Sequence, residues 1–363
     1  MTERVFNFNP GPATLPEEVL KEAQEELLNY KGTGMSIMEN SHRSTQVESL
    51  IAETETLLLE LLGLSDEYQV LFLQGGASTQ FAHLPLNFIT TDKKGYYVIT
   101  GSFAKKAYED AKIAKGNMVE VIASGKENNF RSIVDSEKIK PPQESAYLHI
   151  TSNNTIYGTQ WNDFPDFGGV PLVADMSSDI LSRSLKDTNF ALIYAGAQKN
   201  LGPAGVTIVI VRKDFLEKAS EDLPSMLSYK TIASKNSLYN TPPVFAIYIV
   251  SLVVKWVKSQ GLDAIELQNN QKADLIYKVI DSSSNFYTGH AAKEYRSLMN
   301  ITYKLPNEEL EKLFVQQAND QGLIGLKGHR SVGGIRASIY NAMPVEGCRK
   351  LTDFMKEFQA QNS

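Results

Sequence analysis

Seven short apolar runs lie in the first two thirds of the chain, and their length constrains the fold more than any other feature. They cover residues 69–73, 96–100, 118–122, 146–151, 170–174, 190–194 and 205–211. Each run is too short for a buried helix, and the Val and Ile content is typical of core strands. Helical patterns at 16–30, 44–62 and 77–87 precede or separate the first of these runs. This alternation predicts an α/β fold with a mostly parallel, seven-stranded sheet flanked by helices.

The C-terminal third of the chain has a different order of elements. An apolar helix near 244–260 leads into an amphipathic stretch over 263–281, which indicates the exit from the large domain. The remaining elements form a small α/β unit: strands near 298–304 and 335–339, and helices near 307–321 and 345–360. We expect a large domain over 16–260 and a smaller domain that combines 261–363 with residues 1–15. The N-terminal segment around Pro10 is expected to pack on the small domain or to cross the site.

Composition and charge exclude several classes of protein. The net charge of −6 argues against nucleic acid as the main partner, because a basic surface is needed to neutralise phosphates. Cys348 is the only cysteine, which excludes internal disulfides and four-cysteine zinc sites; we expect no metal and a cytoplasmic location. The N-terminus lacks the basic start and apolar core of a signal peptide. The longest apolar segment, Val244 to Val254, is too short to span a bilayer, so no membrane partner is expected.

Lys199 lies between the runs 190–194 and 205–211, on a turn rich in Gly and Ala. Small neighbours such as Gly196 and Gly202 leave room for a flat group to lie against the backbone, which an exposed lysine would not require. A lysine presented in this way is a candidate Schiff-base nucleophile. The alternative is a solvated surface charge, which is the commonest state of lysine in proteins.

Asp175 ends the run 170–174, about 24 residues before the lysine. Ligands of α/β sheets bind where strands end. A carboxylate there, with a lysine nearby, forms the pair that a pyridoxal phosphate enzyme needs, because the carboxylate keeps the pyridine nitrogen protonated and the ring can then accept electrons. The alternative is that Asp175 caps a following helix through Ser177 or Ser178.

Gly75 and Gly76 follow the run 69–73 and precede the helical pattern at 77–87. A glycine turn at a helix start gathers free backbone N–H groups at the positive end of the helix dipole, so it predicts a phosphate-binding site. No Lys-Ser or Lys-Thr follows, which excludes a Walker loop, and the three-glycine spacing of a dinucleotide fingerprint is absent. Together with the lysine and the carboxylate, this turn predicts pyridoxal 5'-phosphate as the cofactor.

Two His-Arg pairs, His42-Arg43 and His329-Arg330, lie beside polar or glycine-rich turns, and Arg336 follows the second pair. The planar guanidinium group suits carboxylate and phosphate oxygens, and an adjacent histidine adds a donor whose charge depends on pH. These groups predict a small substrate with two anionic ends. The alternative is that both pairs are solvated polar turns.

Eight motifs distributed over the whole chain resemble those of the phosphoserine aminotransferases. The motifs are Asn9-Pro-Gly-Pro12, Ser41-His-Arg-Ser44, Gly75-Gly-Ala-Ser-Thr-Gln-Phe81, Asn153-Asn-Thr-Ile-Tyr-Gly158, Ala174-Asp-Met-Ser-Ser178, Gly196-Ala-Gln-Lys-Asn-Leu-Gly-Pro203, Asn240-Thr-Pro-Pro243 and Gly328-His-Arg-Ser-Val-Gly-Gly-Ile-Arg-Ala-Ser338. The last motif is specific to this family rather than to pyridoxal phosphate enzymes in general. The resemblance implies a fold-type I, class V aminotransferase that works as a homodimer with active sites at the subunit interface.

The resemblance also assigns the catalytic pair and the cofactor site. Lys199 would form the Schiff base and then move a proton between substrate Cα and cofactor C4′, while Asp175 would pair with the pyridinium nitrogen. Thr155 would bond the ring hydroxyl. Phe103, which stands where many bacterial members carry a tryptophan, would stack on the ring. The phosphate would be held by Ala77, Ser78 and Gln198, and by Asn240 and Thr241 of the partner subunit. Ser78 replaces an arginine found in some members.

The substrate contacts and the reaction follow from the same resemblance. Arg336 would bind the substrate α-carboxylate. The phosphate of phosphoserine, or the side-chain carboxylate of glutamate, would be bound by His42, Arg43, His329 and Arg330. The implied reaction is reversible transamination between 3-phosphohydroxypyruvate and L-glutamate, which yields O-phospho-L-serine and 2-oxoglutarate in serine biosynthesis. A related phosphorylated oxo acid of vitamin B6 synthesis is a second candidate substrate.

Two other functions remain open at this point. A cysteine desulfurase of the same fold needs a reactive cysteine on a mobile loop, whereas Cys348 lies in a stretch after Pro344 that is typical of a helix start. We expect this cysteine to be a partly buried bystander. A non-catalytic protein that retains the fold would have lost cofactor residues, whereas Lys199, Asp175 and Thr155 are all present.

Overall fold

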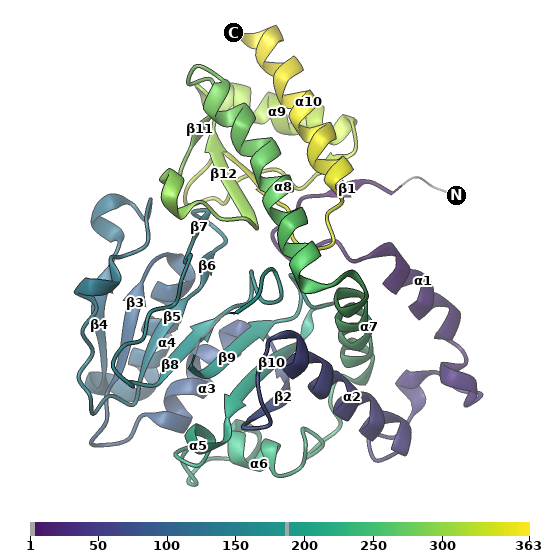
Figure 1. Cartoon of the computed structure of the whole chain (residues 1–363), viewed down its shortest axis with the longest axis vertical. Coiled ribbons are helices and arrows are strands. Elements are labelled where there is room, and N and C mark those ends of the chain that lie inside the picture. Colours follow the sequence, from purple (N-terminus) through teal and green to yellow (C-terminus); the bar gives the residue numbers. More distant parts are fainter. Residues whose placement is uncertain (1–3, 186–188) are drawn as a thin grey trace.

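A seven-stranded sheet forms the centre of the larger part of the molecule (Figure 1). The structure is a computed structural model that describes residues 4–185 and 189–363. The strands lie in the order β2 (Tyr68–Gly75), β10 (Gly205–Arg212), β9 (Phe190–Gly196), β8 (Leu172–Asp175), β5 (Tyr147–Thr151), β3 (Gly95–Ile99) and β4 (Val119–Ser124). Within this sheet β10 is antiparallel to both neighbours, and the other pairs are parallel. Each of the seven predicted runs coincides with a strand, and the mostly parallel sheet is confirmed.

Both faces of the sheet are apolar because helices cover both of them. On β10, Ile208 and Ile210 join the core on one face, together with α2 (Thr45–Leu61) and α7 (Val244–Gln260). Val209 and Val211 join the core on the opposite face, together with α3 (Ala77–Phe88). Burial on two faces explains why the strands occur in the sequence as continuous apolar runs. The shorter helices of this part are α1 (Glu17–Glu26), α5 (Lys213–Leu216) and α6 (Tyr229–Ala233).

The helix α4 (Ser102–Lys115), between β3 and β4, is missing from the sequence prediction. Its core-facing side consists of three buried alanines, Ala104, Ala107 and Ala111. Alanine contributes little to apolar periodicity, so a helix that buries only alanines leaves a weak pattern. The omission matters for function, because the predicted cofactor residue Phe103 lies in the first turn of α4.

The C-terminal residues have a hydrophobic core of their own, to which Ile301, Phe314 and Met355 belong. This part contains α8 (Leu262–Ser282), an antiparallel sheet of β11 (Thr288–Gly289), β12 (Asn300–Lys304) and β14 (Ile335–Ser338), and the helices α9 (Glu308–Asp320) and α10 (Val345–Asn362). The expected small α/β unit is therefore present. The domain boundaries 16–260 and 261–363 stay predictions, and residues 1–3 of the predicted N-terminal part lie outside the described residues.

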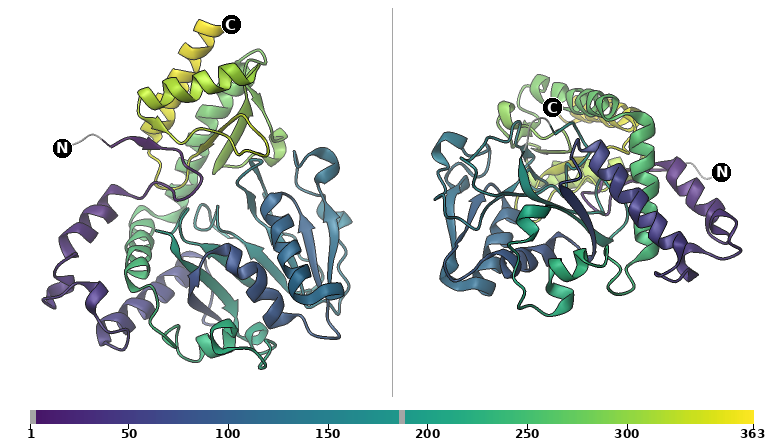
Figure 2. Two further views of the ribbon diagram at one scale, coloured as in Figure 1. Left: turned by 180° about the vertical axis from the view of Figure 1, so that it is seen from behind. Right: turned by 60° about the horizontal axis from the view of Figure 1, so that its bottom comes forward.

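The N-terminal segment connects the two parts of the molecule. Its strand β1 (Phe6–Asn7) pairs in parallel with β13 (Leu323–Ile324) of the C-terminal part. Further along the chain, the Ala13 N–H donates to the Gln198 carbonyl over 2.9 Å. Figure 2 shows the segment passing from the C-terminal part towards α1. The segment therefore packs on the small unit and also reaches the turn that carries Lys199.

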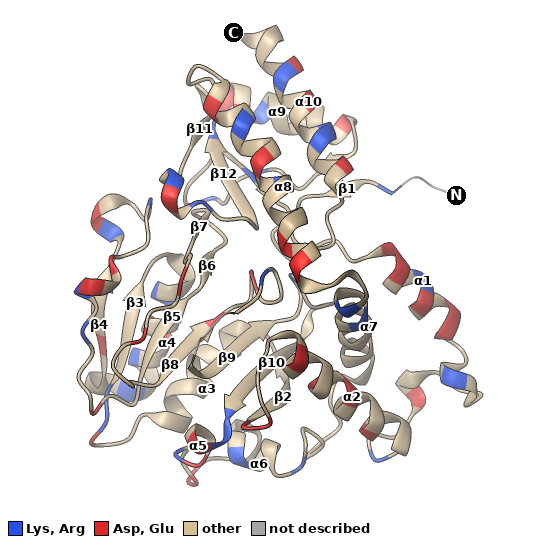
Figure 3. Ribbon diagram, in the orientation of Figure 1, with Lys and Arg blue, Asp and Glu red and all other residues tan. Residues whose placement is uncertain are grey.

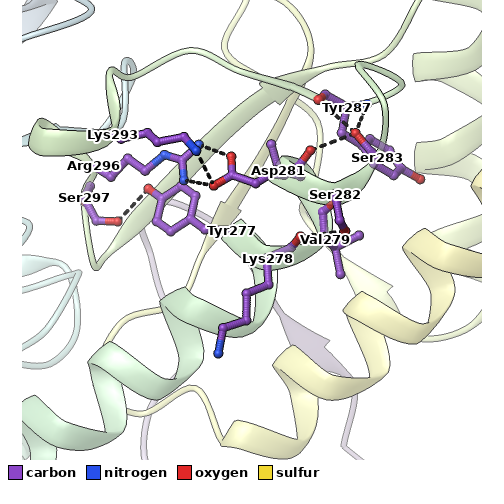
Figure 4. Close-up of polar contacts among 11 residues, drawn as sticks. Tyr277, Lys278, Val279, Asp281, Ser282, Ser283, Tyr287, Lys293, Arg296 and Ser297 are labelled. Carbon is purple, nitrogen blue, oxygen red and sulfur yellow. Dashed lines mark hydrogen bonds and ion pairs between the residues drawn. The ribbon is translucent and has the colours of Figure 1, made fainter.

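A polar cluster fixes the end of α8 to the loop that precedes β12 (Figure 4). Arg296 donates two hydrogen bonds of 2.6 and 2.9 Å to Asp281, and the Tyr277 hydroxyl donates to the Ser297 carbonyl over 2.8 Å. The Ser297 hydroxyl donates in turn to the Asn153 side chain over 2.5 Å. This last contact joins the C-terminal part to the large part.

Acidic and basic residues are mixed over the helices in Figure 3, and the charged residues of α1 are mostly acidic. Within the described residues, no single helix is long and apolar enough to cross a membrane. Helices α7 and α8 meet those criteria of length and composition only as a pair, and they bend by 88° where they join. In the same described ranges, no group of three or more His, Cys, Asp or Glu side chains is arranged to hold a metal ion.

Candidate active site

The candidate site lies at the edge of the sheet where the parallel strands end. Asp175 is the last residue of β8, and Gly76 directly follows β2. Lys199 lies in the turn between β9 and the antiparallel strand β10, which begins at the same edge. A cavity at this edge is lined by Gly76, Ala77, Ser78, Phe81, Phe103, Thr151, Asn153, Thr155, Asp175, Ser177, Ser178, Gln198 and Lys199. The predicted lysine, carboxylate and glycine turn therefore share one cavity at the position where α/β sheets bind ligands.

Lys199 is held by two neighbours inside this cavity. Its Nζ donates to the Thr155 hydroxyl over 2.7 Å and lies 5.3 Å from the centre of the Phe103 ring. Burial lowers the pKa of the amine to about 8; the Asp175 charge opposes this shift, and the Arg336 charge adds to it. About a tenth of the amine is therefore neutral and nucleophilic at pH 7.

Asp175 is buried and accepts two hydrogen bonds from Ser177 at one oxygen. The Ser177 N–H donates to Oδ1 over 3.0 Å, and the Ser177 hydroxyl donates to the same atom over 2.6 Å. Burial raises the pKa of the carboxyl, whereas the Ser177 bonds and the Lys199 charge oppose the rise. No described residue donates to Oδ2, which leaves that oxygen for a ligand. The bond to Ser177 that the capping alternative predicts is present, but residues 177–181 form turns, so Asp175 caps a turn and not a helix.

The start of α3 has the geometry of an anion-binding turn. Gly75 has a φ of +98°, and a Cβ there would collide with the Thr79 hydroxyl, so the position requires glycine. Gly76 is the N-cap of the helix and offers no side chain to cap it. The first N–H groups of a helix have no intrahelical acceptor, and Ala77 and Ser78 line the cavity. Backbone N–H groups and the Ser78 hydroxyl can therefore bind a phosphate.

The remaining cavity walls suit a flat, polar ring. Phe103 offers an aromatic face, and the side chain of Gln198 lines the cavity beside the lysine. The Thr151 hydroxyl is buried and has no hydrogen-bond partner among the described residues. An orphaned hydroxyl at a cavity wall is expected where a polar ligand completes the site. The amine, the carboxylate, the aromatic face and the helix N-terminus together fit pyridoxal phosphate.

The C-terminal part contributes three predicted substrate residues. Arg336, in β14, is buried, and its Nη1 donates to the Thr155 carbonyl over 3.4 Å. Its Nε finds no acceptor in the part of the chain that the structure describes. His329 and Arg330 lie in the turn before β14, where His329 Nδ1 is 2.7 Å from the Ser331 hydroxyl. Burial lowers the pKa of His329, and the charges of Arg336 and Arg330 lower it further. Arg330 and Arg336 therefore form one cationic group beside His329, which burial and these charges keep neutral.

Two other predicted residues, His42 and Thr241, meet outside this cavity, and Arg43 and Asn240 are their neighbours in the chain. The Thr241 hydroxyl lies 2.9 Å from His42 Nδ1, and the Gln74 side chain donates to the Thr241 carbonyl over 3.1 Å. Asn240 precedes Thr241, and the exposed Arg43 follows His42. These four residues do not line the cavity that contains Lys199. One chain thus assembles the predicted site residues in two separate groups.

Sequence reasoning does not identify Thr151, Asn153 and Ser177 as site residues, although all three line the cavity. Thr151 ends β5 and Ser177 follows β8, so the rule that ligands bind at strand ends could have indicated both. Asn153 lies in the short hairpin of β6 (Asn153–Asn154) and β7 (Thr159–Gln160). Strands of two residues leave no periodic pattern, so the only sequence signal at Asn153 is the motif that begins there.

Cys348 lies in the first turn of α10 and is fully buried, whereas the sequence predicts partial burial. Burial raises the pKa of its thiol to about 12. A buried thiol in this protonated state is inert, and Cys348 does not line the cavity. The cysteine desulfurase hypothesis therefore lacks the reactive cysteine that it requires.

The comparison with known proteins agrees with this geometry. The aminotransferase class-V family matches residues 5–351. The phosphoserine aminotransferase of Lysinibacillus sphaericus (strain C3-41) is 55% identical over 363 residues, which is all of both chains. That of Bacillus subtilis (strain 168) is 51% identical over 361 residues, or 99% of each chain. The chain belongs to the aminotransferase class-V family.

Solved structures give the same result for the fold. A phosphoserine aminotransferase from Bacillus circulans subsp. alkalophilus superposes with a TM-score of 0.97 at 51% identity, and all of both chains is covered. A pyridoxal phosphate-bound phosphoserine aminotransferase from Trichomonas vaginalis has a TM-score of 0.92 at 36% identity and covers 97% of this chain and 100% of its own. The predicted fold class is confirmed.

Proposed function

We propose that the protein catalyses reversible amino transfer between L-glutamate and 3-phosphohydroxypyruvate, with pyridoxal 5'-phosphate as cofactor. The products are O-phospho-L-serine and 2-oxoglutarate, and the reaction is a step of serine biosynthesis. The observation that carries the proposal is the meeting of Lys199, Asp175 and the start of α3 in one cavity. It occurs in a chain that is more than half identical to phosphoserine aminotransferases along its length.

The described residues would hold the cofactor at several points. The N–H groups of Ala77 and Ser78 would bind the phosphate, and Asp175 Oδ2 would bind the ring nitrogen. Thr155 would bind the ring hydroxyl, and Phe103 would cover the ring. When bound, the cofactor supplies an electron sink for the negative charge that develops at the substrate Cα.

Lys199 would transfer the proton. Its Nζ, positioned by the Thr155 hydroxyl, would accept the proton from the substrate Cα as a general base and release it again as a general acid. A pKa of about 8 is close to neutral pH, the range in which one group serves efficiently as both base and acid. The neighbouring Gln198 would help to hold the phosphate.

Cationic side chains would orient the substrate. Arg336, whose Nε is buried without an acceptor, would bind the α-carboxylate. His329 and Arg330 would bind the phosphate in one half-reaction and the side-chain carboxylate of glutamate in the other. Both anions carry their charge at the end distant from Cα, so one cationic group can serve both substrates.

A homodimer is part of the proposal, because His42, Arg43, Asn240 and Thr241 group together outside the cavity of their own chain. A second copy would bring this group to the site. The test is complementation: Lys199→Ala and Arg43→Ala are each expected to be inactive, while a co-expressed mixture recovers part of the activity. In a mixed dimer, one of the two sites combines the Lys199 that the Arg43→Ala chain retains with the Arg43 that the Lys199→Ala chain retains. A mixture that stays inactive contradicts shared sites.

A half-reaction assay on the cofactor-loaded protein tests the function itself. Phosphoserine and glutamate are expected to react, serine to react with a kcat/KM lower by roughly a hundred-fold, and Lys199→Ala to be inactive with every donor. Equal rates with serine and phosphoserine would contradict the assignment of the cationic group to phosphate. Sulfide release from cysteine would favour a desulfurase instead.

Two expectations stay predictions. The first is the second substrate, a phosphorylated oxo acid of vitamin B6 synthesis, which the same assay can test in the reverse direction. The second is a cytoplasmic location.

A further inference from the structure

Lys106 is a cation of α4 that has no part in the site described above. It lies one turn after Phe103, and its Nζ is 5.6 Å from the centre of the Phe103 ring. The Nζ of Lys199 is 5.3 Å from the same ring centre. One aromatic side chain of the cavity wall therefore contacts both ammonium groups. Lys106 itself does not line the cavity, so this contact places its ammonium group beside the cavity wall, at the rim.

The charge of Lys106 is not neutralised by its surroundings. The adjacent Lys105 forms an ion pair with Glu109 at 3.2 Å. In residues 4–185 and 189–363, no carboxylate is within ion-pair distance of Lys106, and its side chain is exposed. Two neighbouring lysines of one helix therefore differ, because only Lys106 offers a free ammonium group.

Lys106 adds to the cationic group of the C-terminal part. Burial is the largest cause that lowers the pKa of His329, and the charges of Arg336, Arg330 and Lys106 act in the same direction. No carboxylate is among the described groups that act on His329. Three cationic side chains, Lys106 of α4, Arg330 of the turn before β14 and Arg336 of β14, therefore lie close enough to His329 to act on its pKa. Such a field favours a multiply charged anion.

We propose that Lys106 binds the substrate phosphate and contributes to the preference for a phosphorylated amino donor. This inference rests on the proposed function. A phosphate ester carries between one and two negative charges at neutral pH, whereas the side chain of glutamate carries one. A fixed ammonium group therefore attracts the phosphate more strongly than the carboxylate. A lysine suits this position because its compact charge tolerates a phosphate that stays partly hydrated at the rim.

The test compares Lys106→Met with Lys105→Met, since both changes remove one charge from the same exposed stretch of α4 and keep a chain of similar length. In Lys106→Met the KM for phosphoserine is expected to rise roughly ten-fold, with little change in kcat. The KM for glutamate is expected to rise by less than about three-fold. Lys105→Met is expected to keep both KM values, and Lys106→Arg to restore most of the affinity for phosphoserine.

Binding of inorganic phosphate to the cofactor-loaded protein, measured by calorimetry, gives a readout that does not depend on turnover. Lys106→Met is expected to weaken this binding and to reduce its dependence on salt. The inference would be overturned if Lys106→Met changed neither the Kd for phosphate nor the ratio of the KM values for phosphoserine and glutamate. It would also be overturned if Lys105→Met weakened phosphate binding as much as Lys106→Met. If the unaltered protein transaminated glutamate but not phosphoserine, the proposed function would fail, and the phosphate Kd would still decide the role of Lys106.

Discussion

The Nζ of Lys199 donates a hydrogen bond of 2.7 Å to the hydroxyl of Thr155. The carbonyl of the same threonine accepts from Arg336 Nη1 over 3.4 Å. Thr155 is buried, so neither bond competes freely with water. Thr155, in the hairpin of β6 and β7, thus links Lys199 of the large part to Arg336 of the C-terminal part. Any shift of β14 acts on the residue that positions the amine.

Asp175→Asn is expected to lower the pKa of Lys199 below its present value of about 8, because the Asp175 charge opposes the effect of burial. The pH dependence of the reaction of Lys199 with an amine-specific reagent, in the cofactor-free protein, measures this pKa. The kcat is expected to fall at least about a hundred-fold, since the ring nitrogen loses its anionic partner. Asp179→Asn removes a weaker charge that acts on the same lysine, so it is the control with a smaller shift.

Lys199→Met is expected to stabilise the cofactor-free protein at pH 7 by about 1–3 kcal/mol. The unfolded lysine has a pKa near 10.4, and the folded one a pKa of about 8. At pH 7 folding therefore places a charged amine where the charge is disfavoured. Between pH 8 and about 10.4 the unfolded chain binds more protons, so the unaltered protein gains stability as the pH rises and the advantage of the variant shrinks. Urea unfolding at pH 7 and pH 10 measures both values; a variant less stable at pH 7 contradicts the prediction.

Lys272→Met is expected to destabilise the protein, in contrast to Lys199→Met. Burial lowers the pKa of Lys272 to about 8 as well. Its Nζ donates to the carbonyls of Ile339, Tyr340 and Asn341 over 3.0, 2.8 and 3.5 Å. Removal of the amine leaves these carbonyls without their donor, which is expected to reduce the free energy of unfolding by about 2–4 kcal/mol. Lys278→Met changes an exposed lysine of the same helix and is the control. Equal stability of the two variants would refute the role of the three bonds.

Gly75→Ala is expected to destabilise the protein by about 2–4 kcal/mol and to weaken cofactor binding, because it combines a strained φ of +98° with a collision at Thr79. Gly205→Ala is the matched control. Gly205 pairs with Gly75 across the sheet and has a φ of +111°, but a Cβ there would meet no atom within 4 Å. Only the backbone strain remains, which is expected to cost about 1 kcal/mol. Thermal unfolding and titration with pyridoxal phosphate measure the stability and the cofactor affinity of both variants. If both variants lost the same stability and affinity, the collision with Thr79 would have no effect and the prediction would be wrong.

The core of the site is predictable from sequence because it is built from local features. The strand that ends in Asp175, the glycine turn at Gly75 and the turn that carries Lys199 each leave a pattern of their own, and strand ends of a parallel sheet gather at one edge. The helix α4 is not predictable in this way, since its buried alanines leave little periodicity. Only the family resemblance therefore assigns Phe103 to the cofactor, and the distance of 5.3 Å between its ring centre and the Lys199 Nζ comes from the structure.

Contacts between distant residues form the second part that sequence reasoning could not supply. Arg336 meets Thr155 across 181 positions of the chain, and His42 meets Thr241 across 199. Such contacts depend on how the two parts pack, and neither residue type nor spacing encodes that packing locally. The grouping of His42 with Thr241, away from the cavity of the same chain, was for this reason visible only in three dimensions.

The strand β1 has a consequence for the order of events during synthesis. Phe6 pairs with Leu323, more than three hundred residues later in the chain. The ribosome therefore releases β1 long before its partner exists, and the closure of so large a loop carries a high entropic cost. We expect this pairing to be among the last steps of folding. Because the same segment also donates to Gln198 beside Lys199, the cavity reaches its final shape only after the last third of the chain has emerged.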